Sequence, residues 1–162
     1  MSYFADTPNS VRHELARNLA GLLADTYTLY FTTQVYHWNV EGPMFHSLHQ
    51  LFMDQYSEMA LANDEIAERI RALGFYTPIN LVEMQALSAL SQPDNSIRTA
   101  EAMLEHVIAG HEKVLVRIQS VREVAEKDHD QVSLDLVNAR SQIHEKALWM
   151  LKSQLGKSSR RL

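Results

Sequence analysis

The sequence predicts an all-α fold: a four-helix bundle with a short extra helix in the crossover between the second and third long helices. Four long segments repeat apolar residues at helical spacing, and none alternates in the way of a strand. Only five glycines and four prolines interrupt the 162 residues. The stretch 75–95 is too long for a structureless connection in a compact domain, so it forms the crossover and holds the short helix.

The first long helix is expected from a Thr7–Pro8 cap to Trp38, before Gly42 and Pro43 turn the chain. Its apolar face consists of Val11, Leu15, Leu19, Leu22, Thr26, Leu29 and Thr33. The second long helix is expected from Met44 to Leu73, with Gly74 as a left-handed C-cap.

The second half of the chain continues the helical pattern. The crossover helix is expected from the spacing of Leu81, Met84, Leu87 and Leu90. The cluster 94–96 is expected to start the third long helix, whose stripe is Ile97, Leu104, Ile108, Leu115 and Ile118. A polar break at 127–130 precedes the last helix, which carries Leu136, Ile143, Leu148 and Leu151 and ends near Gly156.

Composition limits the class of protein. With 46% hydrophobic and 22% charged residues, the chain reads as one domain over 1–162, with short tails at 1–7 and 157–162. A formal net charge of −5 suits a protein that attracts cations and disfavours nucleic-acid binding over the whole surface.

Cysteine usage and hydropathy indicate the compartment. The absence of cysteine excludes disulfides, thiolate zinc sites and iron–sulfur clusters. No run approaches the roughly 20 apolar residues of a membrane helix, and the first residues carry no secretory signal. We therefore expect a cytoplasmic protein without a membrane partner.

Imidazoles and carboxylates stand in a pattern that suggests a metal site shared by two chains. The candidate ligands are His37, His49, Asp64 and Glu68, a donor set typical of non-haem iron. Asp64 and Glu68 share one helix face, but His49 precedes Asp64 by about 22 Å along the same helix. An antiparallel second copy, related by a two-fold axis near residues 58–59, brings the histidine of one chain to the acids of the other. Solvated acids and packed histidines are the ordinary alternative.

A longer motif contains these residues. It reads His37-Trp38-Asn39-Val40, Gly42-Pro43-Met44-Phe45, Leu48-His49, Phe52, Tyr56, Asp64-Glu65-Ile66-Ala67-Glu68-Arg69-Ile70 and Leu73-Gly74. The motif and the helix plan resemble the Dps family, DNA-binding proteins from starved cells, which are mini-ferritins of the ferritin-like superfamily. The motif itself covers about a quarter of the chain.

The resemblance implies a function and an assembly. It implies a ferritin-like subunit of a hollow cage, a homo-oligomer of twelve chains, with ferroxidase centres at two-fold interfaces. There iron, Fe(II), is oxidised to Fe(III), preferably by hydrogen peroxide, and is stored as ferric mineral, which protects DNA from oxidative damage. One iron position would use His37 with Asp64 and Glu68 of the second chain, and the other would use His49 and the bridging Glu68. Zinc or another divalent metal suits the same donors.

The sequence departs from the family at Met53. The family has a carboxylate there, one turn after His49, whereas a thioether is a poor ligand for iron. Asp54 and His46 are the candidate helpers, although solvent or packing roles are the ordinary expectation for both. We therefore expect one tight and one weak iron position. The alternative function is a DNA-condensing protective shell whose ferroxidase activity is weak or lost.

Three further features concern iron entry, oxidising equivalents and DNA. In the family, acids near the start of the last helix line pores; Asp135 fits this pattern and Asp130 lies nearby, although helix capping is the ordinary use of Asp130. Trp38 would either intercept oxidising equivalents or pack at an interface. The C-terminal tail 156–162 carries three bases and no acid, so DNA contact, or association with the nucleoid, would run through it. We expect the remaining histidines to be surface or core residues.

Overall fold

The computed structural model describes residues 9–157, which form five helices and no strand. The four long helices are α1 (Asn9–Asn39), α2 (Phe45–Ala72), α4 (Ala100–Lys127) and α5 (Gln131–Gln154). The short helix α3 (Leu81–Leu87) lies in the crossover between α2 and α4. The predicted all-α bundle with one extra crossover helix is confirmed. The expected cap at Thr7–Pro8 and most of the basic tail lie outside the described residues.

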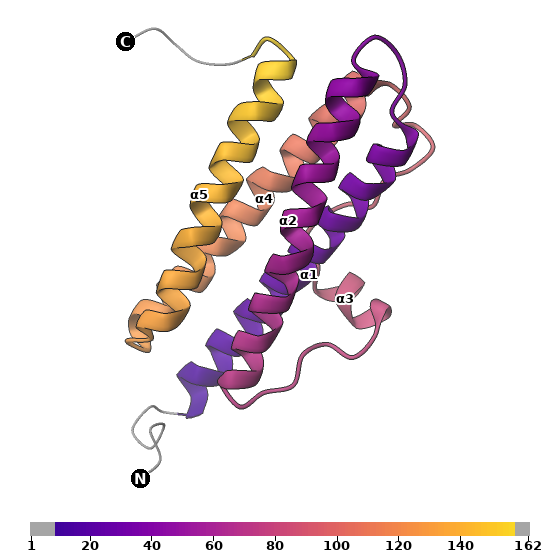
Figure 1. Cartoon of the computed structure of the whole chain (residues 1–162). Helices are drawn as coiled ribbons and strands as arrows, with labels where there is room; N and C mark the ends of the chain where they lie inside the picture. Colours follow the sequence, from indigo (N-terminus) through magenta and orange to yellow (C-terminus); the bar gives the residue numbers. More distant parts are fainter. Residues whose placement is uncertain (1–8, 158–162) are drawn as a thin grey trace, which may run out of the picture.

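The long helices lie side by side as a bundle (Figure 1). α1 packs against α2 and α4, α4 packs against α5, and α3 lies on α1. The crossover runs the length of the bundle, so α2 and α4 point in the same direction, while α1 and α5 point in the opposite one. A bundle with a single long crossover has this order of helix directions.

The buried face of α1 is the one that the sequence predicts. Leu15, Leu19 and Leu22 are fully buried, and Thr26 and Thr33 are buried with them. Each threonine hydroxyl donates to the carbonyl four residues earlier, at 2.8 Å for Thr26 and 2.7 Å for Thr33. Both hydroxyls therefore enter the core without leaving an unpaired polar group there.

Two glycines set the ends of α2. Gly42, with φ 98°, lies in the turn that reverses the chain between α1 and α2. Gly74, with φ 96°, follows the last turn of α2, where its N–H donates to the carbonyl of Arg71 at 2.9 Å. Side chains with a Cβ rarely adopt such φ values. The predicted left-handed glycine at the end of α2 is confirmed, and it directly follows Leu73, which is the C-cap residue.

A buried carboxylate fastens the crossover to the bundle. Asp25 on α1 is fully buried and accepts hydrogen bonds from the backbone N–H of Ala89 at 2.6 Å and the hydroxyl of Ser88 at 3.1 Å. Its other oxygen accepts from Arg117 Nε on α4 at 2.8 Å. One side chain thus joins α1, the crossover and α4.

The expected start of the third long helix at residues 94–96 is wrong. The Asp94 side chain accepts from the backbone N–H of Ser96 at 2.7 Å, which makes a local turn in place of a helix start. Thr99 is the N-cap of α4 and accepts from the N–H of Ala102 at 3.1 Å. Short polar side chains suit both turns and caps, so a polar cluster alone does not show which of the two it forms.

The apolar stripe expected for the last helix is only partly correct. Leu148 and Leu151 are buried, but Ile143 is 38% exposed. The buried face of α5 instead includes two polar side chains, Arg140 and His144. A search for apolar residues at helical spacing misses this face, because its polar side chains are buried together with their hydrogen-bond partners.

Those polar side chains form a network with α2 and α4. Arg140 pairs with Glu58 through both terminal guanidinium nitrogens and donates to His144 Nε2 at 3.1 Å. Since a guanidinium can only donate, His144 carries its proton on Nδ1, which donates to His111 Nδ1 at 2.8 Å. Burial, followed by the charge of Arg140, lowers the pKa of His111 to about 3. Burial, followed by His111 and Arg140, also lowers the pKa of His144.

We predict that thermal stability falls as the pH falls below about 6.5, the ordinary pKa of histidine. The unfolded chain takes up protons on His111 and His144 in this range while the folded chain does not, so acidification favours unfolding. Melting temperatures measured on the two sides of this pKa test the prediction. The variant His129→Asn, at an exposed site, should keep the same pH dependence. A melting temperature that stays constant through this range would contradict the prediction.

Candidate metal centre

The turn between α1 and α2 brings two of the candidate ligands together. His37 is in the last turns of α1 and His49 is in the first turns of α2. Their imidazole rings stack with centroids 3.8 Å apart and an angle of 17° between the planes. His37 is 8% exposed and His49 is half-buried, so the pair lies at the edge of the bundle.

The backbone carbonyl of each histidine determines which nitrogen of the other ring carries the proton. His37 Nδ1 donates to the backbone carbonyl of His49 at 2.7 Å, and His49 Nδ1 donates to the backbone carbonyl of His37 at 2.8 Å. A carbonyl oxygen only accepts, so both protons must be on Nδ1. In the neutral rings Nε2 then carries a lone pair. Orientation of a histidine through a hydrogen bond from its second nitrogen is the usual support of a metal ligand.

Two aromatic rings hold the pair from both sides. Phe45 stacks on His49 with centroids 5.0 Å apart, and Tyr56 stands edge-on to His37 at 5.2 Å. Tyr56 lies seven residues after His49, two helical turns along α2, which places it on the same side of that helix. The sequence motif contained Tyr56, but its contact with a histidine on another helix was not readable from spacing.

The candidate carboxylates lie farther along α2 and are exposed. Asp64 and Glu68 face outward and form no ion pair or hydrogen bond with another described side chain. Because α2 is a continuous helix, Asp64 is about 22 Å from His49 along its axis. Within residues 9–157, no three histidine or acidic side chains come close enough to hold one metal ion. The histidine pair and the acid pair are therefore two separate half-sites in one chain.

Met53 occupies the position of the missing carboxylate. The two candidate helpers near it, Asp54 and His46, differ in the neighbours that they face. Met53 is half-buried, one turn after His49 on the side of α2 that carries Tyr56. Asp54 is exposed, accepts from Gln50 Nε2 at 2.8 Å and lines a cavity of about 180 Å³ between α2 and α5. His46 is exposed in the first turn of α2. Asp54 thus faces α5, away from the histidine pair.

The arginine of the motif has a structural contact. Arg69 NH2 lies 2.5 Å from the carboxylate of Asp130, and Arg69 Nε donates to the hydroxyl of Ser133 at 2.9 Å. Asp130 is also the N-cap of α5, where it accepts from the N–H of Ser133. Burial would raise the pKa of Asp130, but the hydrogen bonds from Arg69 and Ser133 outweigh it and lower the pKa. Capping is therefore the use of Asp130 within this chain.

Asp135, the other acid considered for a pore, is exposed to solvent. Asp135 is exposed in the second turn of α5 and accepts from Gln131 Nε2 at 2.8 Å. Nothing within the described chain neutralises its charge by an ion pair. A pore role for Asp135 stays a prediction.

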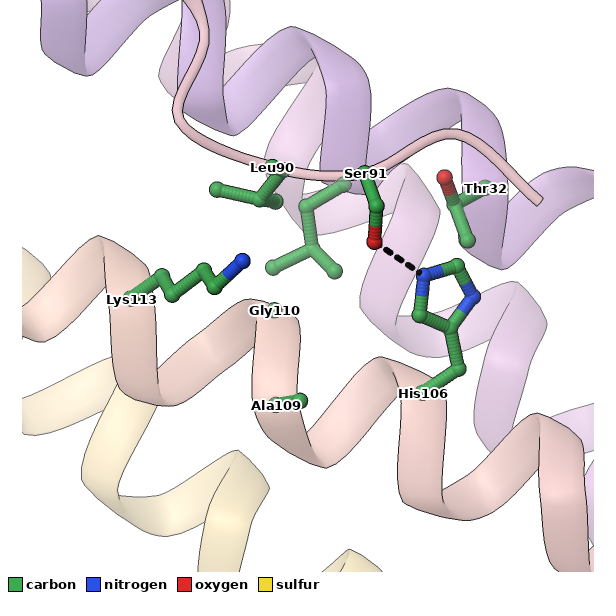
Figure 2. Close-up of a pocket in the computed structure, with 8 residues that line it drawn as sticks. Thr32, Leu90, Ser91, His106, Ala109, Gly110 and Lys113 are labelled. Carbon is green, nitrogen blue, oxygen red and sulfur yellow. Dashed lines mark hydrogen bonds between the residues drawn. The ribbon is translucent and has the colours of Figure 1, made fainter.

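Another histidine contributes to a second hydrogen-bonded cluster. The Tyr36 hydroxyl lies 2.5 Å from His106 Nδ1. The hydroxyl of Ser91 lies 3.1 Å from His106 Nε2 (Figure 2). The cavity beside it, lined by Thr32 and Lys113 among others, measures about 20 Å³. That is close to the ~10–15 Å³ needed for a single water molecule, so it is too small for a substrate.

Three comparisons place the chain among known proteins. The family model of the ferritin-like domain matches residues 16–161. DNA protection during starvation protein 2 of Bacillus anthracis is 34% identical over 133 residues, which cover 82% of this chain and 90% of that protein. An uncharacterized low temperature-induced protein of Nostoc is 35% identical over 133 residues, covering 81% of this chain and 74% of that protein.

Comparison with solved structures finds Dps proteins as well. The crystal structure of a Dps protein from Vibrio cholerae O1 superposes with a TM-score of 0.87 at 27% identity, over 92% of this chain and 93% of that one. It is described as a member of a broad superfamily of ferritin-like diiron-carboxylate proteins.

We predict that Arg69→Gln lowers the thermal stability more than Arg71→Gln does. Losing Arg69 leaves the largely buried carboxylate of Asp130 without its cation, a change that costs roughly 3–5 kcal/mol. Arg71 is exposed and donates only to the carbonyl of Phe75 at 3.1 Å. Thermal unfolding of the two variants measures the difference, and equal melting temperatures would contradict the structural role of Arg69.

Proposed function

The chain belongs to the Dps family of mini-ferritins within the ferritin-like proteins, and on that premise we propose that it is an iron-oxidising and iron-storing subunit of an oligomeric cage. In this proposal Fe(II) is the substrate and hydrogen peroxide is the oxidant. The ferric product is stored, and DNA is thereby protected from the radicals that ferrous iron makes with peroxide.

The observation that carries the proposal is the reciprocal hydrogen bonding of His37 and His49. Both rings are held with Nδ1 protonated and with the Nε2 lone pair free. Two neutral imidazoles with fixed orientation are suitable donors for a ferrous ion. They have no carboxylate neighbour within the described chain, so the ion needs oxygen ligands from another source.

A second copy of the chain supplies those ligands in our proposal. Two α2 helices packed antiparallel about a two-fold axis bring Asp64 and Glu68 of one chain to His37 and His49 of the other. At the level of the axis, Met59 is buried and Glu58 pairs with Arg140. The exposed side chains that would meet there are those of Ser57, Ala60 and Leu61.

Exposed apolar side chains support an assembly of this kind. Leu61 on α2 is 70% exposed, and α3 contains no fully buried residue. Large apolar side chains are exposed along α1, α2 and the crossover. They are Phe31, Trp38, Phe45, Leu61, Tyr76, Ile79, Leu81, Val82 and Leu87. An apolar surface of this extent is unusual for a monomer and typical of a subunit interface. Burial at a subunit contact is thus the role we assign to Trp38.

The chemistry of the centre follows from its donors. Carboxylates are hard, charged oxygen ligands that stabilise Fe(III) more than Fe(II), so Asp64 and Glu68 favour loss of an electron. Zinc accepts the same imidazole and carboxylate donors and would compete for the site without being oxidised. Met53 stands where the family has one more carboxylate, so we propose one tight iron position and one weak position for each centre.

The first test compares peroxide-driven oxidation of Fe(II), followed by absorbance, in the natural protein and in His49→Asn. We expect the natural protein to oxidise Fe(II) and the variant to lose most of the rate, because one of two fixed imidazoles is gone. Asp54→Asn should keep the rate, since Asp54 faces α5. A natural protein without activity would support the alternative, a protective shell whose ferroxidase was lost with the carboxylate.

We predict that Met53→Glu raises the rate of peroxide-driven iron oxidation and the number of irons bound tightly by each centre. The new carboxylate lies one turn after His49, where it can serve the weak position. The matched control is Gln50→Glu, which adds the same charge to α2 on the side that faces Asp54. An unchanged rate in Met53→Glu, or an equal gain in both variants, would contradict this account of Met53.

For DNA we propose contact through the basic tail, most of which lies outside the described residues. A net charge of −5 leaves the rest of the chain unfavourable for a duplex, whereas many tails on one cage act together. We expect the natural protein to shift DNA in gels at low salt and a protein lacking residues 157–162 not to do so. Equal shifts by both proteins would show that the tail is not the DNA contact.

A further inference from the structure

The side of α2 that faces α5 borders a cavity which the proposed metal centre does not use. The cavity measures about 180 Å³, and His111 of α4 lines it together with residues of α2 and α5. In Figure 1, α4 runs between α2 and α5 and behind them. His111 is only 2% exposed, whereas Asp54 and Lys146 on the same cavity are exposed. The imidazole therefore lies at the inner end and the two charged side chains lie at the opening.

The hydrogen-bond network of the bundle leaves one donor free at the inner end of this cavity. Arg140 donates to His144 Nε2, and His144 Nδ1 donates to His111 Nδ1 at 2.8 Å. A neutral imidazole carries a single proton, so the proton of His111 is on Nε2. Within residues 9–157 this N–H has no hydrogen-bond partner. A buried donor without an acceptor is costly, so an acceptor atom inside the cavity would be stabilised there.

A second unpaired polar group borders the cavity from α2. Gln55 lines the cavity, and its amide oxygen and nitrogen are both buried without a partner in the described part of the chain. The amide both accepts and donates, whereas His111 Nε2 only donates. A hydroxyl group accepts from His111 and meets the amide of Gln55 whichever way that amide is turned. A carbonyl oxygen suits only one of the two orientations.

Apolar side chains form most of the remaining wall. They come from α2 and α5 and are Leu51, Met59, Ile143, Ala147 and Met150. Methionine sulfur makes favourable contacts with aromatic rings, so two methionines favour a ring over a straight chain. A cavity of roughly 150 Å³ accommodates benzene. The cavity of about 180 Å³ therefore has room for one ring with a hydroxyl group.

The charges around the cavity balance one another. Glu58 lines the cavity and is paired with Arg140. The exposed Asp54 and Lys146 contribute one charge of each sign. Moving an ion from water into an apolar cavity costs much more than moving a neutral molecule. A neutral ligand is therefore favoured over an ammonium ion or a carboxylate.

The cavity lies apart from the surface that we assign to the second chain. Gln55 and Met59 each precede a residue of that surface, Ser57 and Leu61, by two positions. This spacing turns them about 160° around the axis of α2. The residues that line the cavity are also different from the exposed apolar side chains assigned to the subunit contact. The proposed pairing of two α2 helices therefore leaves the cavity uncovered.

We propose that this cavity binds one small neutral phenol. The ring packs against Met59 and Met150, and the hydroxyl accepts from His111 Nε2 and pairs with the amide of Gln55. Binding requires neither iron nor oxidation, so it is independent of the proposed ferroxidase function.

Calorimetric titration of the assembled, iron-free natural protein with phenol and with toluene tests this inference. The two molecules are nearly equal in size, and only phenol has a hydroxyl group. We expect one phenol to bind saturably to each chain. Toluene should bind at least about tenfold more weakly, because it leaves His111 and Gln55 unpaired. A crystal structure of the complex should place the phenol oxygen within about 3.2 Å of His111 Nε2.

Variants of the lining show which side chains recognise the hydroxyl. Gln55→Leu removes the amide at similar size and should lower the affinity for phenol about tenfold without lowering that for toluene. The matched control is Gln119→Leu, at an exposed residue of α4 that pairs with Glu123, and it should keep both affinities. Ala147→Leu fills the cavity from α5 and should abolish binding of phenol. Melting temperatures without ligand show whether each variant is folded.

The comparison of phenol with toluene needs no variant, so it decides the inference even if a variant does not fold. A natural protein that shows no saturable binding of phenol overturns the inference and indicates a cavity that holds only water. Equal affinities for phenol and toluene also overturn it, because the hydroxyl is then not recognised. Unchanged affinity for phenol in Gln55→Leu, or phenol bound elsewhere in the crystal, overturns it as well. Each of these outcomes leaves the ferroxidase function as it stands.

Discussion

The reciprocal hydrogen bonds between His37 and His49 join the last turns of α1 to the first turns of α2. Each imidazole donates to the backbone carbonyl of the other residue, so neither ring can turn without breaking a bond that fixes its neighbour. The stacked rings, with centroids 3.8 Å apart, also set the separation of the two helices at this end of the bundle. The turn at Gly42, the flanking Phe45 and the edge-on Tyr56 all serve this one arrangement. The result is a pair of neutral imidazoles whose Nε2 atoms have fixed directions and can bind a metal ion.

The histidine pair lacks carboxylate ligands, and this accounts for the exposed acids and apolar side chains elsewhere on the surface. The donors have no acid beside them in the described chain, while two acids stand unpaired farther along the same helix. A helix about 22 Å long between the two half-sites cannot bend to close them, but an antiparallel copy can. The exposed apolar side chains of α2 and the crossover, Leu61 and Leu81 among them, are suited to the same contact. The incomplete site and the unburied apolar surface thus point to one requirement, a second chain.

Helical periodicity and turn residues were sufficient to predict the bundle, the crossover helix and the left-handed Gly74 at the end of α2. The start of α4 was not predictable, because Asp94 and Thr99 are both good cap residues and only the packed structure selects Thr99. The buried face of α5 was missed because Arg140 and His144 read as surface residues until Glu58 and His111 are seen beside them.

At the candidate centre, the residue types and their spacing predicted the four ligands, which stay predictions. The proton positions, the stacking and the neighbouring tyrosines depend on contacts between helices and were not readable from the sequence. Met53 was identified only because a family pattern has a carboxylate at that position. The structure adds that the nearby Asp54 faces α5, so it does not stand in for the missing ligand within this chain.

The central claim is that each metal site is shared by two chains, and subunit complementation tests it most directly. One chain carries His37→Asn and His49→Asn, and the other carries Asp64→Asn and Glu68→Gln; each alone should fail to oxidise Fe(II) with peroxide. In mixed pairs, the intact histidines of one chain meet the intact acids of the other at one of the two sites, so random co-assembly should restore roughly a quarter of the sites. Mixed particles that stay inactive, or activity in either variant alone, would contradict a shared site.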